Sequence, residues 1–150
     1  LPGYAPTPLI DLPALARELG IGRLWVKDES CRLGLPAFKI LGASWATLQA
    51  LERHAAEAGA PLGPWQSVAE LAAQLRPLLP LTLAAATDGN HGRAVAHMAR
   101  LLGLGAHIFV PLGTADARIE ALRDEGAAVT VVDGSYDDAV ALSATMAGPR

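Results

Sequence analysis

The stretch Leu81–Leu102, LTLAAATDGNHGRAVAHMARLL, joins an apolar run to a helical pattern through a loop of small and polar residues. Residues 81–86 are apolar apart from one threonine, as in a buried strand. From residue 91 to 102 the apolar side chains recur at spacings of three or four, which predicts an amphipathic helix with Gly103 after it. A strand followed by a helix is the repeating unit of α/β proteins.

The same unit returns towards the C-terminus. Strands are predicted at 106–110 and 128–132 and a helix at 115–125, and Ser135 with Asp138 caps a last helix to about residue 147. Alternating strands and helices favour a parallel sheet with helices on both faces. The predicted fold class is therefore α/β, a small doubly wound parallel sheet.

Towards the N-terminus the pattern is less regular. Asp11 is expected to cap a short helix that Gly20 ends, and residues 23–27 are expected to form a strand. Apolar spacing predicts a helix from Gly42 to about residue 58, and a capping box formed by Ser67 and Glu70 predicts another to residue 75.

Composition narrows the class of protein. The 150 residues are 51% hydrophobic and 18% charged with a net charge of −3, which fits a globular domain with one core. The 12 lysines and arginines are scattered, so we expect no nucleic-acid partner. No apolar run is long enough to span a bilayer, and the single cysteine, Cys31, excludes an intramolecular disulfide. These features favour a cytoplasmic protein with no membrane partner.

Lys39 is the first candidate for chemistry. It lies in the run Ala37–Ser44, AFKILGAS, between apolar neighbours. Partial desolvation would lower the pKa of its ammonium group, which helps a lysine to form an imine with a carbonyl. The alternative is an ordinary lysine whose aliphatic stem covers apolar surface while its charge reaches water.

The loop Ala86–Arg93, ATDGNHGR, is the second candidate. Gly89 could adopt a positive φ, Gly92 could permit close backbone approach, and Asn90 and His91 could bind a ligand. The loop follows a strand of a parallel sheet and precedes a helix, where free N–H groups bind anions. The alternative is plain helix capping by Asp88 or Asn90.

The two candidates together resemble the fold-type II pyridoxal-phosphate enzymes. The residues Phe38–Ala43, FKILGA, are similar to the run around the Schiff-base lysine of the dehydratases in that superfamily, with Leu41 in place of their usual arginine. The residues Thr87–His91, TDGNH, are similar to their asparagine loop, with Asp88 as a departure.

The two motifs with these departures, together with two further motifs, resemble one branch of that superfamily, the diaminopropionate ammonia-lyase family. The four motifs are LWVKDES at Leu24–Ser30, LPAFK at Leu35–Lys39, the ATDGNHGR loop and DGSYDDAV at Asp133–Val140. They stand in the order of that family and correspond to its N-terminal part. The resemblance implies an enzyme that splits 2,3-diaminopropionate into pyruvate and ammonia.

The resemblance also implies roles for single residues. Lys39 would hold pyridoxal phosphate as a Schiff base and Asn90 would bond the ring hydroxyl of the cofactor. Thr87, Gly89 and His91 would help to seat the substrate carboxylate. The family pattern makes Asp88 a second base, opposite Lys39, for the D substrate; we add that its charge suits a β-ammonium group. A homodimer is implied as well, and no metal.

The same resemblance predicts the domain organisation. Residues 1–41 would belong to a larger cofactor domain and residues 42–150 would form a small α/β domain, with the rest of the catalytic domain absent. The glycine-rich loop that holds the cofactor phosphate in the family would lie C-terminal to residue 150. We therefore expect a fragment that is inactive alone.

Other readings stay open. A serine or threonine dehydratase would share the chemistry, although Leu41 and Asp88 speak against it, and a truncated α/β module could act without catalysis. His54, His97 and His107 have no metal-ligand spacing; His97 is expected to be solvated. The tryptophans Trp25, Trp45 and Trp65 are expected to be core residues or half-buried anchors.

Overall fold

The computed structural model describes residues 3–87 and 89–146. These divide into two compact units, Gly3–Phe38 and the part of the chain from Lys39 onward. No helix in the described residues is long and apolar enough to cross a membrane.

The unit Gly3–Phe38 is built on a short antiparallel pair of strands. Strand β1 (Leu9–Asp11) pairs with β2 (Trp25–Lys27), with Ile10 opposite Val26, and helix α1 (Pro13–Glu18) lies between them in sequence. The prediction that Asp11 caps α1 is wrong, since Asp11 belongs to β1 and the residue before the helix, Leu12, makes no side-chain cap. Pairing with β2 determines the conformation of residues 9–11, and three residues are too few to show a strand pattern.

This unit is organised around a buried charge rather than an apolar core. Arg32, 4% exposed, donates to both carboxylate oxygens of Glu29 at 2.7 Å and to the carbonyl of Ala5 at 2.5 Å. Thr7 donates to Glu29 at 2.6 Å and closes the network. Many large apolar side chains of the unit are exposed, namely Tyr4, Leu9, Ile10, Leu15, Leu19, Ile21, Trp25, Val26 and Phe38.

A three-stranded parallel sheet forms the centre of the second unit. Strand β4 (Gly105–Pro111) lies between β3 (Thr82–Ala86) and β5 (Ala128–Val132), with Phe109 opposite Ala86 on one side and Thr130 on the other. The central strand is the most buried, because Ile108, Phe109 and Val110 have almost no exposed surface. The predicted α/β fold with a parallel sheet is confirmed.

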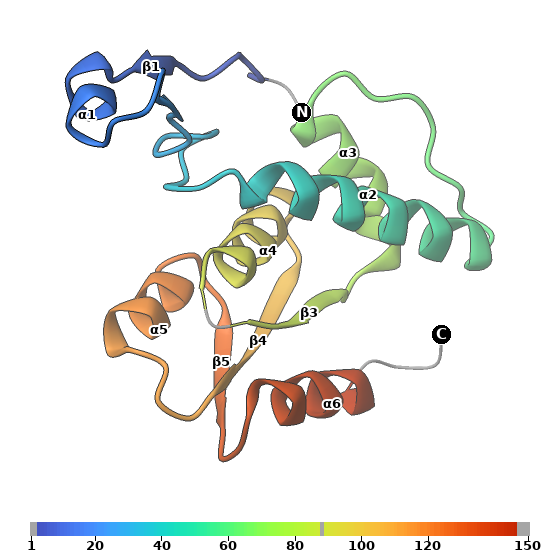
Figure 1. Cartoon of the computed structure of the whole chain (residues 1–150). Coiled ribbons are helices and arrows are strands. Elements are labelled where there is room, and N and C mark those ends of the chain that lie inside the picture. The colour runs from blue at the N-terminus through green and yellow to red at the C-terminus, as the bar shows by residue number, and fades with distance from the viewer. Residues whose placement is uncertain (1–2, 88, 147–150) are drawn as a thin grey trace. The chain divides into compact units, whose positions relative to one another are not determined.

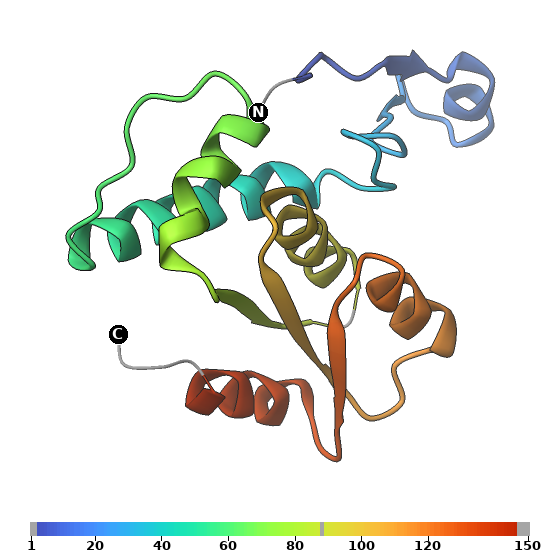
Figure 2. The ribbon, with the colours of Figure 1, turned by 180° about the vertical axis from the view of Figure 1, so that it is seen from behind.

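Helices cover both faces of this sheet. Helix α4 (Asn90–Leu102) packs on β3 and β4, and α5 (Asp116–Arg123) packs beside it on β5. Helix α6 (Tyr136–Met146) packs on β3 and β4 from the opposite face, as Figures 1 and 2 show from two sides. Gly103 ends α4 at a φ of 71°, a left-handed conformation that favours glycine.

Helices α2 (Lys39–Glu57) and α3 (Val68–Leu75) form a further layer on α4, and the short 3₁₀ helix Arg76–Leu78 follows α3. Helix α2 begins at Lys39, three residues before the predicted start, because Ile40 is buried and extends the buried face of the helix towards the N-terminus. The buried stripe is Ile40, Ala43, Ser44, Thr47, Leu51 and Ala55. Small residues in this stripe allow α2 to approach α4 closely.

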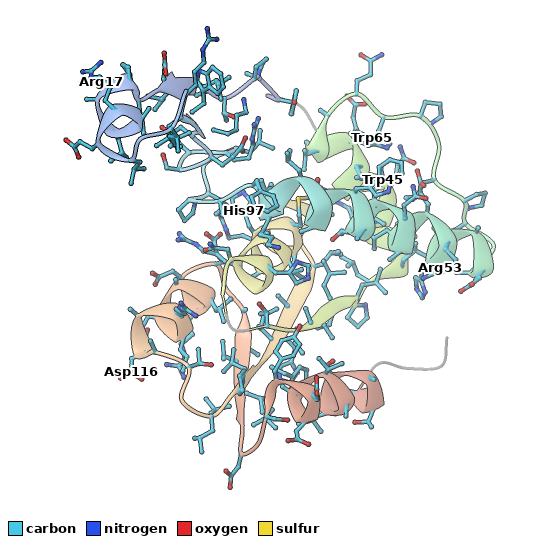
Figure 3. The ribbon with its side chains drawn as sticks, in the orientation of Figure 1. Arg17, Trp45, Arg53, Trp65, His97 and Asp116 are labelled. Atoms are coloured by element: carbon cyan, nitrogen blue, oxygen red, sulfur yellow. The ribbon has the colours of Figure 1, made fainter. Side chains whose placement is uncertain are left out.

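The tryptophans lie outside the core in this chain. Trp45 is 65% exposed and Trp25 is 47% exposed, whereas Trp65 is half-buried. Figure 3 shows Trp45 on α2. The expectation of a core or half-buried position is therefore wrong for Trp45, whereas Trp25 and Trp65 are partly covered. On α2 the reason is that small side chains, not the indole, face α4.

Candidate active site

A cavity of about 870 Å³ opens at the carboxyl edge of the sheet in the second unit. Its walls come from the first residue of α2, from the loop and first turn of α4, from α5 and from the first residue of α6. The lining residues are Lys39, Thr87, Gly89, Asn90, His91, Arg93, Ala117, Arg118, Ala121 and Tyr136. The volume is in the range of small-molecule sites, about 300–1,000 Å³.

Thr87 organises the loop between β3 and α4. It is 4% exposed, and its backbone N–H donates to the carbonyl of Phe109 at 2.9 Å, which continues the ladder of the sheet. Its Oγ1 accepts from the backbone N–H groups of Gly89 at 3.2 Å and Gly92 at 3.3 Å. Thr87 thus takes the part of a helix cap, while the N-cap residue, Gly89, makes no side-chain cap.

Two expectations about the glycines have different outcomes. Gly89 has a φ of −173° and open space where a Cβ would lie, so the predicted positive φ is wrong. Gly92 does permit close approach: a Cβ there would collide with the Thr87 methyl group and lie 3.0 Å from Ile108 Cγ2 and 3.3 Å from Leu122 Cδ2. The glycine lets α4 pack tightly on β4 and α5.

The first turn of α4 presents backbone N–H groups at the cavity. Asn90 and His91 are the first two helical residues, and their N–H groups make no hydrogen bond to another described residue. The first N–H groups of a helix have no partner within it, and the helix dipole adds partial positive charge. This wall of the cavity is suited to a carboxylate or another anion.

Lys39 is exposed in this structure and lies on the cavity wall at the start of α2. Of its apolar neighbours in sequence, Ile40 is buried, whereas Phe38 is 54% exposed. The desolvation expected from these neighbours is therefore limited in this chain. The useful property of Lys39 is its position, on the same cavity as the asparagine loop.

His91 faces the same cavity as Lys39. Partial burial lowers the pKa of His91 below its ordinary value of 6.5, and the positive charge of Lys39 lowers it further. The imidazole is therefore neutral at pH 7 and can both donate and accept a hydrogen bond.

Five of the six predicted site residues line one cavity: Lys39, Thr87, Gly89, Asn90 and His91. The sixth, Asp88, lies outside the described residues. Sequence reasoning missed Arg93, Arg118 and Tyr136 on the cavity walls. Their position near the carboxyl ends of neighbouring strands was the available signal, because such ends meet at one edge of a parallel sheet.

His97 is not solvated as expected. Its side chain is 14% exposed, and its Nδ1 lies 2.9 Å from a carboxylate oxygen of Glu125, a residue that follows α5. Arg93 and Arg100 contact the same carboxylate. Sequence spacing could not reveal this cluster because Glu125 comes from another element.

The chain belongs to the family of pyridoxal-phosphate-dependent enzymes, because the family model described as "Pyridoxal-phosphate dependent enzyme" matches residues 1–149. Among its relatives, the chain is 41% identical over 148 residues to the diaminopropionate ammonia-lyase of Salmonella typhimurium. The solved apo structure of the Escherichia coli diaminopropionate ammonia-lyase aligns with 97% of this chain, with a TM-score of 0.82 and 40% sequence identity. The structure of that enzyme in complex with D-serine matches with the same TM-score, identity and share of this chain.

The resemblance inferred from the four motifs is thereby confirmed. The chain spans just over a third of these proteins: 36% of the Salmonella enzyme and 38% and 36% of the two solved chains. It aligns from near its first residue to near its last, so the similarity extends over both of its compact units.

The cavity fits the cofactor of the family in its chemistry. Lys39 supplies a primary amine, Asn90 an amide side chain, and the start of α4 supplies N–H donors. The described residues contain no group of three histidine, cysteine or acidic side chains that could hold a metal ion.

Proposed function

We propose that this chain is the N-terminal part of a pyridoxal-phosphate-dependent lyase that eliminates ammonia from 2,3-diaminopropionate. One observation carries the proposal: the lysine and the asparagine loop of the family, about 50 residues apart in sequence, line one cavity in a chain about 40% identical to diaminopropionate ammonia-lyases. The products would be pyruvate and two molecules of ammonia.

In this proposal Lys39 holds the cofactor through its Nζ and the Asn90 amide bonds the ring hydroxyl. The bound cofactor supplies an electron sink for the Cα–H bond of an amino acid. The N–H groups of Asn90 and His91, which no other described residue engages, seat the substrate carboxylate, with Thr87 and Gly89 beside them. The neutral His91 imidazole adds a hydrogen-bond donor without a second charge.

Asp88 is assigned the second acid–base role. It stands between Thr87 and Gly89, both of which line the cavity, and its own placement is outside the described residues. Lys39 would take the α-proton of the L substrate and Asp88 that of the D substrate. The same carboxylate would attract the β-ammonium group and so favour diaminopropionate over serine or threonine.

The remainder of the site would come from elsewhere in a longer protein. We assign residues 1–41 to a larger cofactor domain and residues 42–150 to the small domain. The exposed apolar side chains of Gly3–Phe38 support this, because an isolated unit rarely leaves so many exposed. A glycine-rich phosphate loop, a homodimer and a cytoplasmic location complete the proposal, and the 150-residue chain alone should be inactive.

The test uses the protein expressed from its complete reading frame. Formation of pyruvate and ammonia from D- and L-diaminopropionate is expected, and Lys39→Ala should abolish both. Asp88→Asn should slow turnover of the D isomer by about 10²-fold or more while sparing much of the L reaction.

Three results would contradict the proposal or one of its parts. Deamination of L-serine or L-threonine without turnover of diaminopropionate would indicate a dehydratase. Equal loss on both isomers in Asp88→Asn would remove the two-base assignment. An unchanged preference for diaminopropionate over serine in that variant would remove the role of its charge in selection.

A further inference from the structure

Glu125 is a buried carboxylate that two arginines and a histidine of one helix surround. It is 7% exposed and lies in the turn between α5 and β5, because α5 ends at Arg123, two residues before the predicted end. Its Oε2 lies 2.9 Å from His97 Nδ1 and accepts from Arg100 Nη2 at 3.0 Å, and its Oε1 accepts from Arg93 Nε at 3.3 Å.

The three partners form a stripe along α4 at positions 93, 97 and 100, one helical turn apart. Figure 3 marks His97 on this helix. Glu125 therefore ties the full length of that face of α4 to the end of α5. Both helices contribute walls to the cavity, through Arg93 on α4 and Arg118 on α5.

Glu125 is held in its charged form. Burial is the largest single influence and by itself raises the pKa of Glu125, but the hydrogen bonds from His97, Arg100 and Arg93 and the electrostatic attraction of His97 together leave the pKa below its ordinary value. A buried carboxylate with three donors is restricted in position, since any displacement would leave a charge unpaired in a poorly solvated place.

Arg93 occupies a position that helix electrostatics disfavours. It lies in the first turn of α4, where the partial positive charge of the N–H groups opposes a cation. Glu125 compensates this through the Nε of Arg93, and the two Nη groups are the part of the guanidinium that Glu125 does not engage. The same side chain, 31% exposed, lines the cavity one turn after Asn90 and His91.

We infer that Glu125 is a positioning residue, which fixes the Arg93 guanidinium at the cavity wall, and that Arg93 binds the carboxylate of the amino-acid substrate there. The inference rests on the proposed function for the identity of the ligand. It adds Arg93 and Glu125 to the site residues that the motifs identified. His97 and Arg100 hold Glu125 in place and do not reach the cavity lining.

The experiment measures binding of D-serine to the cofactor-loaded protein from its complete reading frame, by equilibrium dialysis with labelled ligand. Glu125→Gln keeps the shape of the side chain and removes its charge; Arg93→Gln removes the guanidinium, and the double variant completes the cycle. Glu120→Gln is the matched control, because it removes an exposed carboxylate of α5 that pairs with Arg123. Glu125→Asp replaces Glu125→Gln if the latter does not fold.

Glu125→Gln and Arg93→Gln should each weaken D-serine binding about tenfold, and the double variant no more than Arg93→Gln alone. Glu120→Gln should bind as the unaltered protein does. The inference is overturned if Glu125→Gln weakens D-serine binding by the same factor whether Arg93 is present or replaced, or does not weaken it at all. Glu125 would then be a purely structural partner in an ion pair. Failure of the proposed function shows separately, as absence of diaminopropionate turnover in the unaltered protein.

Discussion

Thr87 and Gly92 are joined across the loop between β3 and α4 by a hydrogen bond of 3.3 Å, from the Gly92 backbone N–H to Thr87 Oγ1. Both residues are buried. The contact brings the third residue of α4 against the end of β3, so that Asn90 and His91 project at the carboxyl edge of the sheet. The geometry of the candidate site thus depends on the hydroxyl of Thr87 and on the absence of a side chain at Gly92.

Gly92→Ala should destabilise the protein by about 1–3 kcal/mol, because the added methyl group collides with Thr87 and the neighbouring Ile108 and Leu122 have little room to move. Urea unfolding measures the change. Gly42→Ala is the control: it lies inside α2 with open space around the new methyl group, and it should stabilise by about 0.5–1 kcal/mol. Equal effects of the two substitutions would contradict the close packing at Gly92.

Thr87→Val should also destabilise the protein, by about 1–3 kcal/mol. The branched shape is kept, but the buried N–H of Gly92 loses its acceptor. Thr87→Ser keeps the hydroxyl and should retain that hydrogen bond, at the smaller cost of one methyl group. If the valine variant proves as stable as the serine variant in urea unfolding, the hydrogen bond contributes nothing to the loop.

The elements around this loop could be predicted from the sequence because their signals are local. Apolar periodicity located β3, β4 and β5 and the helices between them. The capping box of Ser135 and Asp138 is present as predicted. Ser67 caps α3 as predicted, but the carboxylate of Glu70 accepts from the N–H of Gln66. Strand β1 could not be predicted, since three residues carry no pattern and its partner lies 14 or more residues away.

The candidate site could be predicted from the sequence only in part. Lys39 and the asparagine loop could be singled out through motifs. Glu125 could not, because its nearness to α4 follows from the strand order β3-β4-β5, which places α5 beside α4. The spacing of residues along the helix predicted a solvated His97, whereas the packing of α5 beside α4 places the Glu125 carboxylate against its ring.

The network at Glu29 should make the unit Gly3–Phe38 sensitive to acid. Hydrogen bonds from Arg32 and then Thr7 lower the pKa of Glu29 from 4.5 to about 2. Since the folded-state pKa is the lower one, the stabilisation is fully present above pH 4.5 and is lost as the pH falls towards 2. Amide hydrogen exchange in β1 and β2 should accelerate over this range.

Glu29→Gln should remove that acceleration and expose β1 and β2 to faster exchange already at neutral pH, because Arg32 loses its charged partner. Glu18→Gln, on the exposed surface of α1, is the matched control and should leave the pH dependence in place. Exchange rates in β1 and β2 that follow the same pH profile in the Glu29→Gln variant would rule out Glu29 as the titrating group.

His91 should report the charge of Lys39 directly. In the cofactor-free protein its pKa, followed by NMR, should lie below 6.5, for reasons of burial first and of the Lys39 charge second. Lys39→Met should therefore raise the pKa of His91 only part of the way back. Because the folded-state pKa is below the unfolded one, the unfolded state binds more protons, and stability should fall as the pH drops through 6.5. This loss should be smaller in Lys39→Met.

Arg53→Met is the control, since Arg53 lies on the same helix, 14 residues or about 21 Å further along, beyond the screening length of physiological salt. A pKa of His91 that responds equally to both substitutions would mean that it senses the net charge of the protein and not a lysine across the cavity.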